Sequence, residues 1–199
     1  MKIKNLIIIG LTALALASCN DFLDVESPSA YSEGFVFSQR TEINRALNGV
    51  YASILVNNLY GNAYQRTFIY NSDVEMTMFT SNVATRNSYI NSYWQASYNA
   101  IEYVNRFIHG LENSEWYDEE DPEIMQWMGE AKCLRAMVYH DLVVLFGDLP
   151  FTFESAAQLG DGFVIPVTDR EEIQRKLIED LEGIAPKMSS SATTTVERA

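Results

Sequence analysis

The stretch EIMQWMGEAKCLRAMVYHDLVVLFGDLPF, residues 123–151, decides the fold of this chain. Its apolar side chains recur at steps of three and four residues, the spacing that places them on one face of an α-helix: Trp127, Ala131, Leu134, Val138, Leu142 and Leu145. Beyond Arg135, apolar residues also occupy the other faces, which is typical of a helix packed on several sides. Asp121 followed by Pro122 predicts its start, and Gly147 predicts its end. We therefore predict a central helix in an α-rich domain.

Three other segments have the periodicity of amphipathic helices. The first begins near Ser38 or Thr41, the second covers residues 92–111, and the last follows a capping box at residues 168–171. A short strand is predicted at residues 163–165. Because no strict repeat period is present, we expect an all-α fold of antiparallel helix pairs stacked side by side.

Several residues on these helices are assigned structural roles. Arg135 interrupts the apolar surface of the central helix, and we interpret it as an ion pair or carbonyl cap that holds adjacent helices. Asn105 lies on the buried stripe of the second helix, where it is expected to hydrogen-bond backbone in a neighbouring turn, and Trp94 is assigned to the same stripe. Cys133 is interpreted as a small buried hydrophobe.

The composition and motifs exclude several classes of function. The formal net charge of −13 argues against nucleic-acid binding, which needs Lys and Arg at the phosphates. The sequence contains no HExxH, GxSxG, Walker or GxGxxG motif, and structural roles are predicted for His109 and His140. The consecutive carboxylates at residues 118–123 are interpreted as a solvated loop leading into a helix. We therefore predict no catalytic residue, no metal site and no cofactor.

Residues 59–91 form the one segment whose composition suggests binding. They are rich in Tyr, Phe, Asn, Ser and Thr, without a sustained period, and are interpreted as loops with a short helix at residues 73–78. Aromatic rings stack on the apolar faces of sugars, while amides, carboxylates and Arg bond the hydroxyls. The alternative is that these aromatic residues pack the loop onto the helices.

The N-terminal segment has the pattern of an export signal. Lys2 and Lys4 precede an apolar run that is too short to span a bilayer, and Leu16-Ala17-Ser18-Cys19 follows. This sequence resembles a bacterial lipobox. The alternative is an ordinary signal peptide that has a Cys near its cleavage site by chance. The resemblance implies removal of residues 1–18 and acylation of Cys19, which would anchor the protein to a membrane. We expect a polar tether over residues 19–37 and a helical domain over residues 38–199.

A family resemblance rests on motifs that occur in order along the chain. Behind the lipobox come Cys19–Asp24, Leu47–Tyr51, Trp94 to Ile108, Gly129–Ala136, Tyr139 to Pro150, and Asp180 to Pro186. Together they resemble the N-terminal part of the SusD/RagB family of nutrient-binding outer-membrane lipoproteins. The resemblance implies helix pairs like those of tetratricopeptide repeats, oligosaccharide binding at the cell surface, and a SusC-like TonB-dependent transporter as partner. It covers less than half of the family's usual length, so a truncated sequence is expected.

Three functional hypotheses follow, and the resemblance favours the first. The first is a glycan-binding lipoprotein of the outer membrane that hands its ligand to the transporter without catalysis. The others are a glycosidase on a helical scaffold, which would need two converging carboxylates, and a helical scaffold that binds only protein. Within the first hypothesis, the candidate ligand-binding residues are Tyr60, Tyr64, Arg86 and Tyr89.

Overall fold

The computed structural model describes residues 33–62, 64 and 83–189, and the description below concerns these residues. The long helices are α3 (Arg40–Ile54), α6 (Val83–Glu112), α7 (Pro122–Phe146) and α9 (Arg170–Ile184). Shorter elements are the helices α2 (Glu33–Val36) and α8 (Ala156–Leu159), the 3-10 helix η1 (Ala185–Lys187), and the strands β1 (Leu149–Pro150) and β2 (Val167–Thr168).

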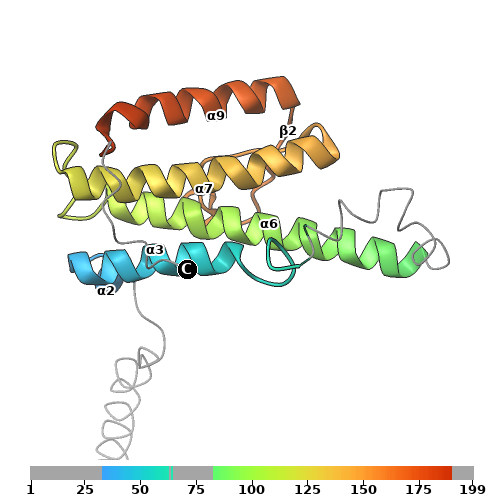
Figure 1. Cartoon of the computed structure of the whole chain (residues 1–199), viewed down its shortest axis with the longest axis horizontal. Coiled ribbons are helices and arrows are strands. Elements are labelled where there is room, and N and C mark those ends of the chain that lie inside the picture. The colour runs from blue at the N-terminus through green and yellow to red at the C-terminus, as the bar shows by residue number, and fades with distance from the viewer. Residues whose placement is uncertain (1–32, 63, 65–82, 190–199) are drawn as a thin grey trace, which may run out of the picture. The chain divides into compact units, whose positions relative to one another are not determined.

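The four long helices lie side by side in chain order, and each runs antiparallel to the one before it (Figure 1). Helix α6 packs against both α3 and α7, and α7 packs against α9. The two short strands pair antiparallel, with Leu149 opposite Thr168, and connect α7 to α9. The predicted all-α fold of stacked antiparallel helices is therefore confirmed. Among the described residues, no helix is both long and apolar enough to cross a membrane.

Helix α7 has the ends that its sequence predicts. The Asp121 side chain accepts hydrogen bonds from the backbone N–H groups of Glu123 and Ile124, at 2.9 and 3.2 Å. At the other end Gly147 adopts a φ of 78°, a conformation that other residues rarely take, and its N–H bonds the Val143 carbonyl. Hydrogen bonds between residues close in sequence therefore cap both ends of α7.

Two groups of buried side chains form the core. The first, called the Tyr93 core, joins the C-terminal half of α7 to the middle of α6 and the first half of α9, and includes Tyr93, Ile101, Val138, Tyr139, Leu142 and Ile173. The second, called the Trp127 core, joins the first halves of α3 and α7 to the C-terminal half of α6, and includes Ile43, Leu47, Phe107, Leu111, Trp127 and Met128. Leu134 packs against both groups.

Two predicted element boundaries are wrong. Helix α6 begins at Val83 and not near residue 92, because residues 83–91 contain no Gly or Pro to end a helix whose later turns are packed. The strand lies at Val167–Thr168 and not at residues 163–165, since only the later residues face a partner strand. The short helix predicted at residues 73–78 lies outside the described residues.

Two predicted residue roles are also corrected. The N-cap of α9 is Asp169 and not Thr168: its side chain accepts hydrogen bonds from the backbone N–H groups of Glu171 and Glu172, while Thr168 is paired in β2. Cys133 is exposed rather than buried, because it lies in an open hollow between α7 and α9. Helix α2 falls inside the segment predicted as a tether; the tether residues before it are outside the described part of the chain.

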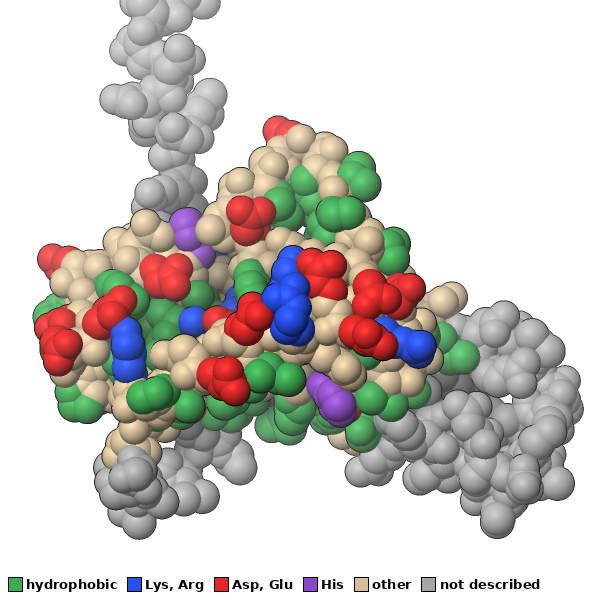
Figure 2. Space-filling model, turned by 90° about the horizontal axis from the view of Figure 1, so that it is seen from above, with side chains coloured by type: hydrophobic (Ala, Val, Ile, Leu, Met, Phe, Trp, Pro, Cys, Tyr) green, Lys and Arg blue, Asp and Glu red, His purple; other side chains and the backbone are tan. Residues whose placement is uncertain are grey.

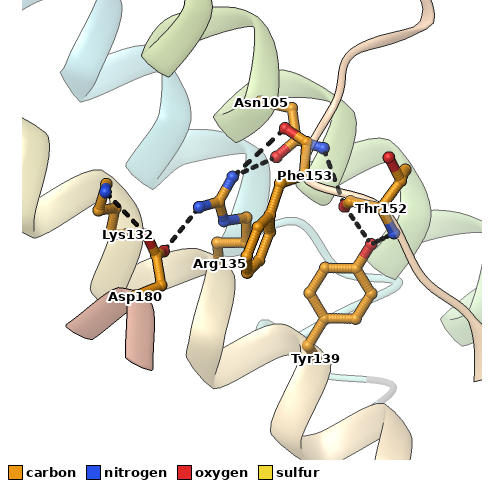
Figure 3. A network of polar contacts seen from close by, with 7 residues as sticks. All are labelled: Asn105, Lys132, Arg135, Tyr139, Thr152, Phe153 and Asp180. Carbon is orange, nitrogen blue, oxygen red and sulfur yellow. Dashed lines mark hydrogen bonds and ion pairs between the residues drawn. The ribbon is translucent and has the colours of Figure 1, made fainter. Parts of the chain in front are cut away.

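A buried arginine connects three of the helices. Arg135 of α7 is only 3% exposed, and its guanidinium donates to Asn105 Oδ1 of α6 at 2.9 Å and to Asp180 Oδ2 of α9 at 2.7 Å (Figure 3). It also lies over the ring of Phe153, 3.9 Å from the centroid. Lys132 bonds the other oxygen of Asp180. The ion-pair role predicted for Arg135 is confirmed.

The same network fixes the loop that follows β1. The Asn105 amide donates to the backbone carbonyls of Thr152 and Glu154, as its sequence position predicted. Tyr139 Oη donates to the Thr152 carbonyl and accepts from the Thr152 N–H, at 2.8 and 3.2 Å (Figure 3). Burial raises the pKa of Tyr139 to about 12, so its phenol stays neutral. The loop is therefore held by side chains of α6 and α7.

Replacing Gly110 by Ala tests the packing of the turn between α2 and α3 against α6. A Cβ at residue 110 would lie 2.0 Å from Phe37 Cε2, whereas a Cβ at Gly49, inside α3, would meet nothing within 4 Å. We expect Gly110→Ala to lower the free energy of unfolding by about 1–3 kcal/mol through overpacking. Gly49→Ala should raise it by up to about 1 kcal/mol through helix propensity. Denaturant unfolding followed by circular dichroism measures both free energies. If the two variants changed the free energy of unfolding equally, the close packing of Phe37 on Gly110 would be contradicted.

Replacing Arg135 by Ala tests the network. The change leaves the Asp180 carboxylate and the Asn105 carbonyl without their partner, so we expect a loss of about 3–5 kcal/mol in the free energy of unfolding. Arg175→Ala is the matched control, because Arg175 makes an exposed pair with Glu179 within α9, and such pairs contribute about 0.5 kcal/mol or less. Similar losses for both variants would show that the buried network contributes little.

Candidate functional site

Two of the four predicted ligand residues lie together in the turn that follows α3. The N–H groups of Tyr60 and Tyr64 bond the carbonyls of Ile54 and Leu59, and Leu59 is fully buried, which anchors the turn. The two tyrosine rings have centroids 4.9 Å apart. Both side chains are half-buried, so part of each ring remains open to solvent.

These rings continue into a larger group, called here the aromatic cluster: Tyr60, Tyr64, Tyr93, Trp94, Tyr98 and Phe146. Tyr64 is 6.2 Å from Tyr93 between centroids, and Trp94 meets Phe146 edge-on at 4.9 Å. Trp94 is thus part of the packed stripe, as predicted. The cluster holds the turn after α3 against α6 and α7.

Asp141 of α7 is the carboxylate of this cluster. Its Oδ2 accepts a hydrogen bond from the Tyr60 hydroxyl, at 2.5 Å. Burial, and after it the negative charge of Asp141, raises the pKa values of Tyr60, Tyr64 and Tyr93. Tyr93 Oη is buried and has no hydrogen-bond partner among the described residues. The three phenols therefore stay neutral at physiological pH, and Asp141 orients the hydroxyl of Tyr60.

The other predicted site residues are placed differently. Arg86 and Tyr89 belong to the first turns of α6 and not to a loop, which corrects the loop assignment. Their side chains lie outside what the structure describes, as does Cys19. The structure therefore brings together Tyr60 and Tyr64 and leaves the roles of Arg86, Tyr89 and Cys19 as predictions.

A hollow between α3 and α6, with a lining of both polar and apolar side chains, was missed by the sequence analysis. It encloses about 310 Å³ and is called here the amide groove; its polar lining consists of Ser53, Asn58, Ser92, Gln95, Asn99 and Tyr103. Val56, Ala96 and Ala100 complete the lining. The spacing of Gln95, Asn99 and Tyr103, four residues apart, was the available signal, because it places three polar side chains on one face of α6.

The acidic segment at the start of α7 has a structural role. Asp121 and Glu123 both pair with Arg40 of α3, and Glu119 pairs with Lys187 of η1. The hydrogen bond from Arg40 keeps the pKa of Asp121 below its ordinary value. Over residues 33–62, 64 and 83–189, no three His, Cys, Asp or Glu side chains form a group that could hold a metal ion.

Comparison with known proteins identifies the class. The sequence model of a SusD-like family described as "Starch-binding associating with outer membrane" matches residues 21–195. Two SusD-like proteins of Formosa agariphila are 22% and 24% identical to this chain, over 92% and 85% of its length. The alignments cover only 37% and 35% of those proteins, so the chain spans about a third of their length.

A solved structure shows the same fold. The crystal structure of a SusD-like carbohydrate-binding protein from Bacteroides fragilis matches with a TM-score of 0.60 and 18% sequence identity. The match covers 82% of this chain and 34% of that one. These stacked helices have the fold of the SusD-like class, whose family model is described as outer-membrane-associated. The chain belongs to its SusD/RagB family, as the ordered motifs predicted.

Replacing Asp141 by Asn tests the electrostatics of the aromatic cluster. Without the carboxylate, the pKa of the half-buried Tyr64 should fall, and Tyr60 should lose a hydrogen bond to a charged group, which lowers the free energy of unfolding by about 1.5–3 kcal/mol. Because the folded-state pKa values are raised, their contribution to stability is present below about pH 10 and is lost as the pH rises further.

Absorbance titration of tyrosinate, with circular dichroism to monitor folding, measures the pKa change. Tyr64→Phe in both backgrounds assigns the signal to Tyr64. Asp161→Asn is the control, since Asp161 is an exposed aspartate outside the cluster. An unchanged titration in Asp141→Asn, with the fold intact, would show that Asp141 does not set these pKa values.

Proposed function

We propose that this protein is a lipid-anchored carbohydrate-binding protein of the outer membrane that captures oligosaccharides and delivers them to a SusC-like TonB-dependent transporter. The match of the starch-binding family over residues 21–195 carries this proposal. The B. fragilis relative is named a carbohydrate-binding protein, which adds support. Because the chain spans only about a third of its relatives, the whole protein's ligand and partner are part of the proposal.

Membrane attachment at Cys19 rests on the sequence. A basic start and a short apolar run lead to Leu16-Ala17-Ser18-Cys19, and acyl chains on Cys19 would hold the protein at the membrane. The family description as outer-membrane-associated agrees with this placement. The segment at residues 19–32, together with the start of the helical domain, would then let the domain stand off the lipid surface.

The turn after α3 supports a role in carbohydrate binding. Tyr60 and Tyr64 are half-buried, so each ring is fixed by packing while part of its surface stays accessible. Rigid rings bind sugar faces at a low cost in conformational entropy. We propose that this pair, together with Arg86 and Tyr89 of α6, contributes to the ligand site.

A binding role without catalysis agrees with the groups at the site. General acid–base catalysis needs a group that titrates near the working pH. The phenols around Asp141 have raised pKa values and stay protonated, and Asp141 is engaged by Tyr60. A glycosidase would require two carboxylates set across a sugar, which is why we prefer the binding role.

Replacing Tyr64 by Ala tests the proposal. The mature protein should bind oligosaccharides from a panel in calorimetry, and loss of one stacking ring, worth about 1–1.5 kcal/mol, should weaken binding about tenfold. Tyr117→Ala is the matched control, because Tyr117 is also half-buried but packs against the Trp127 core. Absence of binding to every member of the panel, with no transporter co-purifying from the native membrane, would contradict the proposed function.

A further inference from the structure

The amide groove lies between α6 on one side and α3 with the turn after it on the other. The sequence pattern of neither helix reveals that they meet here. Gln95, Asn99 and Tyr103 occupy successive turns of α6, and Ser53 and Asn58 face them from the end of α3 and the turn beyond it. Ala96 and Ala100 are buried beneath these side chains, and their small size leaves the hollow open. Its volume of about 310 Å³ lies at the lower end of the range for small-molecule sites.

The groups that line the groove have unused hydrogen-bonding capacity. Each of the side-chain amides of Asn58, Gln95 and Asn99 offers two donors and one acceptor, and none makes a hydrogen bond to another described residue. Tyr103 is 56% exposed, so a face of its ring is open beside the amides. Adjacent donors, acceptors and an aromatic surface match the paired hydroxyls and apolar C–H face of a sugar ring.

The charge of the lining narrows the class of ligand. Among the described residues, no charged side chain lines the groove, although acidic side chains are prominent on the surface seen from the α9 side (Figure 2). An anionic sugar would find no counter-charge there and would be opposed by the chain's net charge of −13. A neutral sugar has no such cost, because amides and hydroxyls satisfy it without ion pairing.

We propose that the amide groove is a subsite for neutral saccharide units, which selects uncharged oligosaccharides over uronate-containing or sulfated ones. This inference rests on the proposed function and deepens it by naming a site and a ligand class. The sugar ring lies against Tyr103, with its hydroxyls bonded by Asn58, Gln95 and Asn99. The groove and the Tyr60–Tyr64 pair share the turn after α3.

Calorimetry on the mature protein tests this site with two sets of oligosaccharides: neutral glucans, and uronate-containing or sulfated chains. The unchanged protein should bind the neutral set at least tenfold more tightly. Asn99→Ala removes up to three hydrogen bonds and should weaken neutral binding five- to fifty-fold. Asn99→Lys places a cation in the groove and should improve binding of the anionic set. Gln174→Ala, an exposed amide on α9 outside the groove, should change neither.

The outcomes separate this inference from the proposed function. Suppose that neutral glucans bind and that Tyr64→Ala weakens their binding, while Asn99→Ala and Tyr103→Ala do not. The proposed subsite in the amide groove is then wrong, and the proposed carbohydrate binding stands. If the neutral and the anionic oligosaccharides bind equally tightly, only the proposed selection of uncharged ligands is wrong. If the unchanged protein binds neither set, the proposed function fails as well. Circular dichroism of each variant establishes that it is folded, and Asn99→Lys provides a gain that misfolding cannot produce.

Discussion

The guanidinium of Arg135 is the contact on which the arrangement of these helices depends. Removing a charge from water costs several kcal/mol, and the cost is offset only where a counter-charge and hydrogen-bond acceptors surround it. Asp180 of α9, Asn105 of α6 and the ring of Phe153 provide that environment together. Because the partners come from separate elements, the buried charge is satisfied only when those elements are in register. The interaction therefore specifies one arrangement of α6, α7 and α9.

Because this network fixes the position of α6, it determines which face of the helix lies toward α7 and which lies toward α3. The stripe containing Trp94, Ile101 and Asn105 faces α7, which leaves the stripe containing Gln95, Asn99 and Tyr103 toward α3. The Phe37 ring, from the turn between α2 and α3, packs against Gly110 near the C-terminal end of α6. The amide groove lies nearer the other end of α6, beside the turn after α3.

Local chemistry made some of this structure predictable. Helix α7 was recognisable from its periodicity, its Asp121 cap and Gly147, since each depends on residues close in sequence. Arg135 and Asn105 were assigned correctly because a polar residue on an apolar stripe must find a partner. The start of α6 was not predictable, because its first turns have no apolar stripe. The groove depends on the approach of α3 to α6, a tertiary contact that neither helix's sequence reveals.

The candidate sites have one electrostatic property in common. The phenols near Asp141 are held neutral by burial and by that carboxylate, and the groove is lined by amides, hydroxyls and apolar side chains. Contacts between neutral groups are little affected by salt, whereas those between exposed charges are screened within about 10 Å at moderate ionic strength. In the proposed location outside the cell, salt and pH would vary. Recognition through neutral groups would keep its affinity constant there, while the acidic side chains elsewhere maintain solubility.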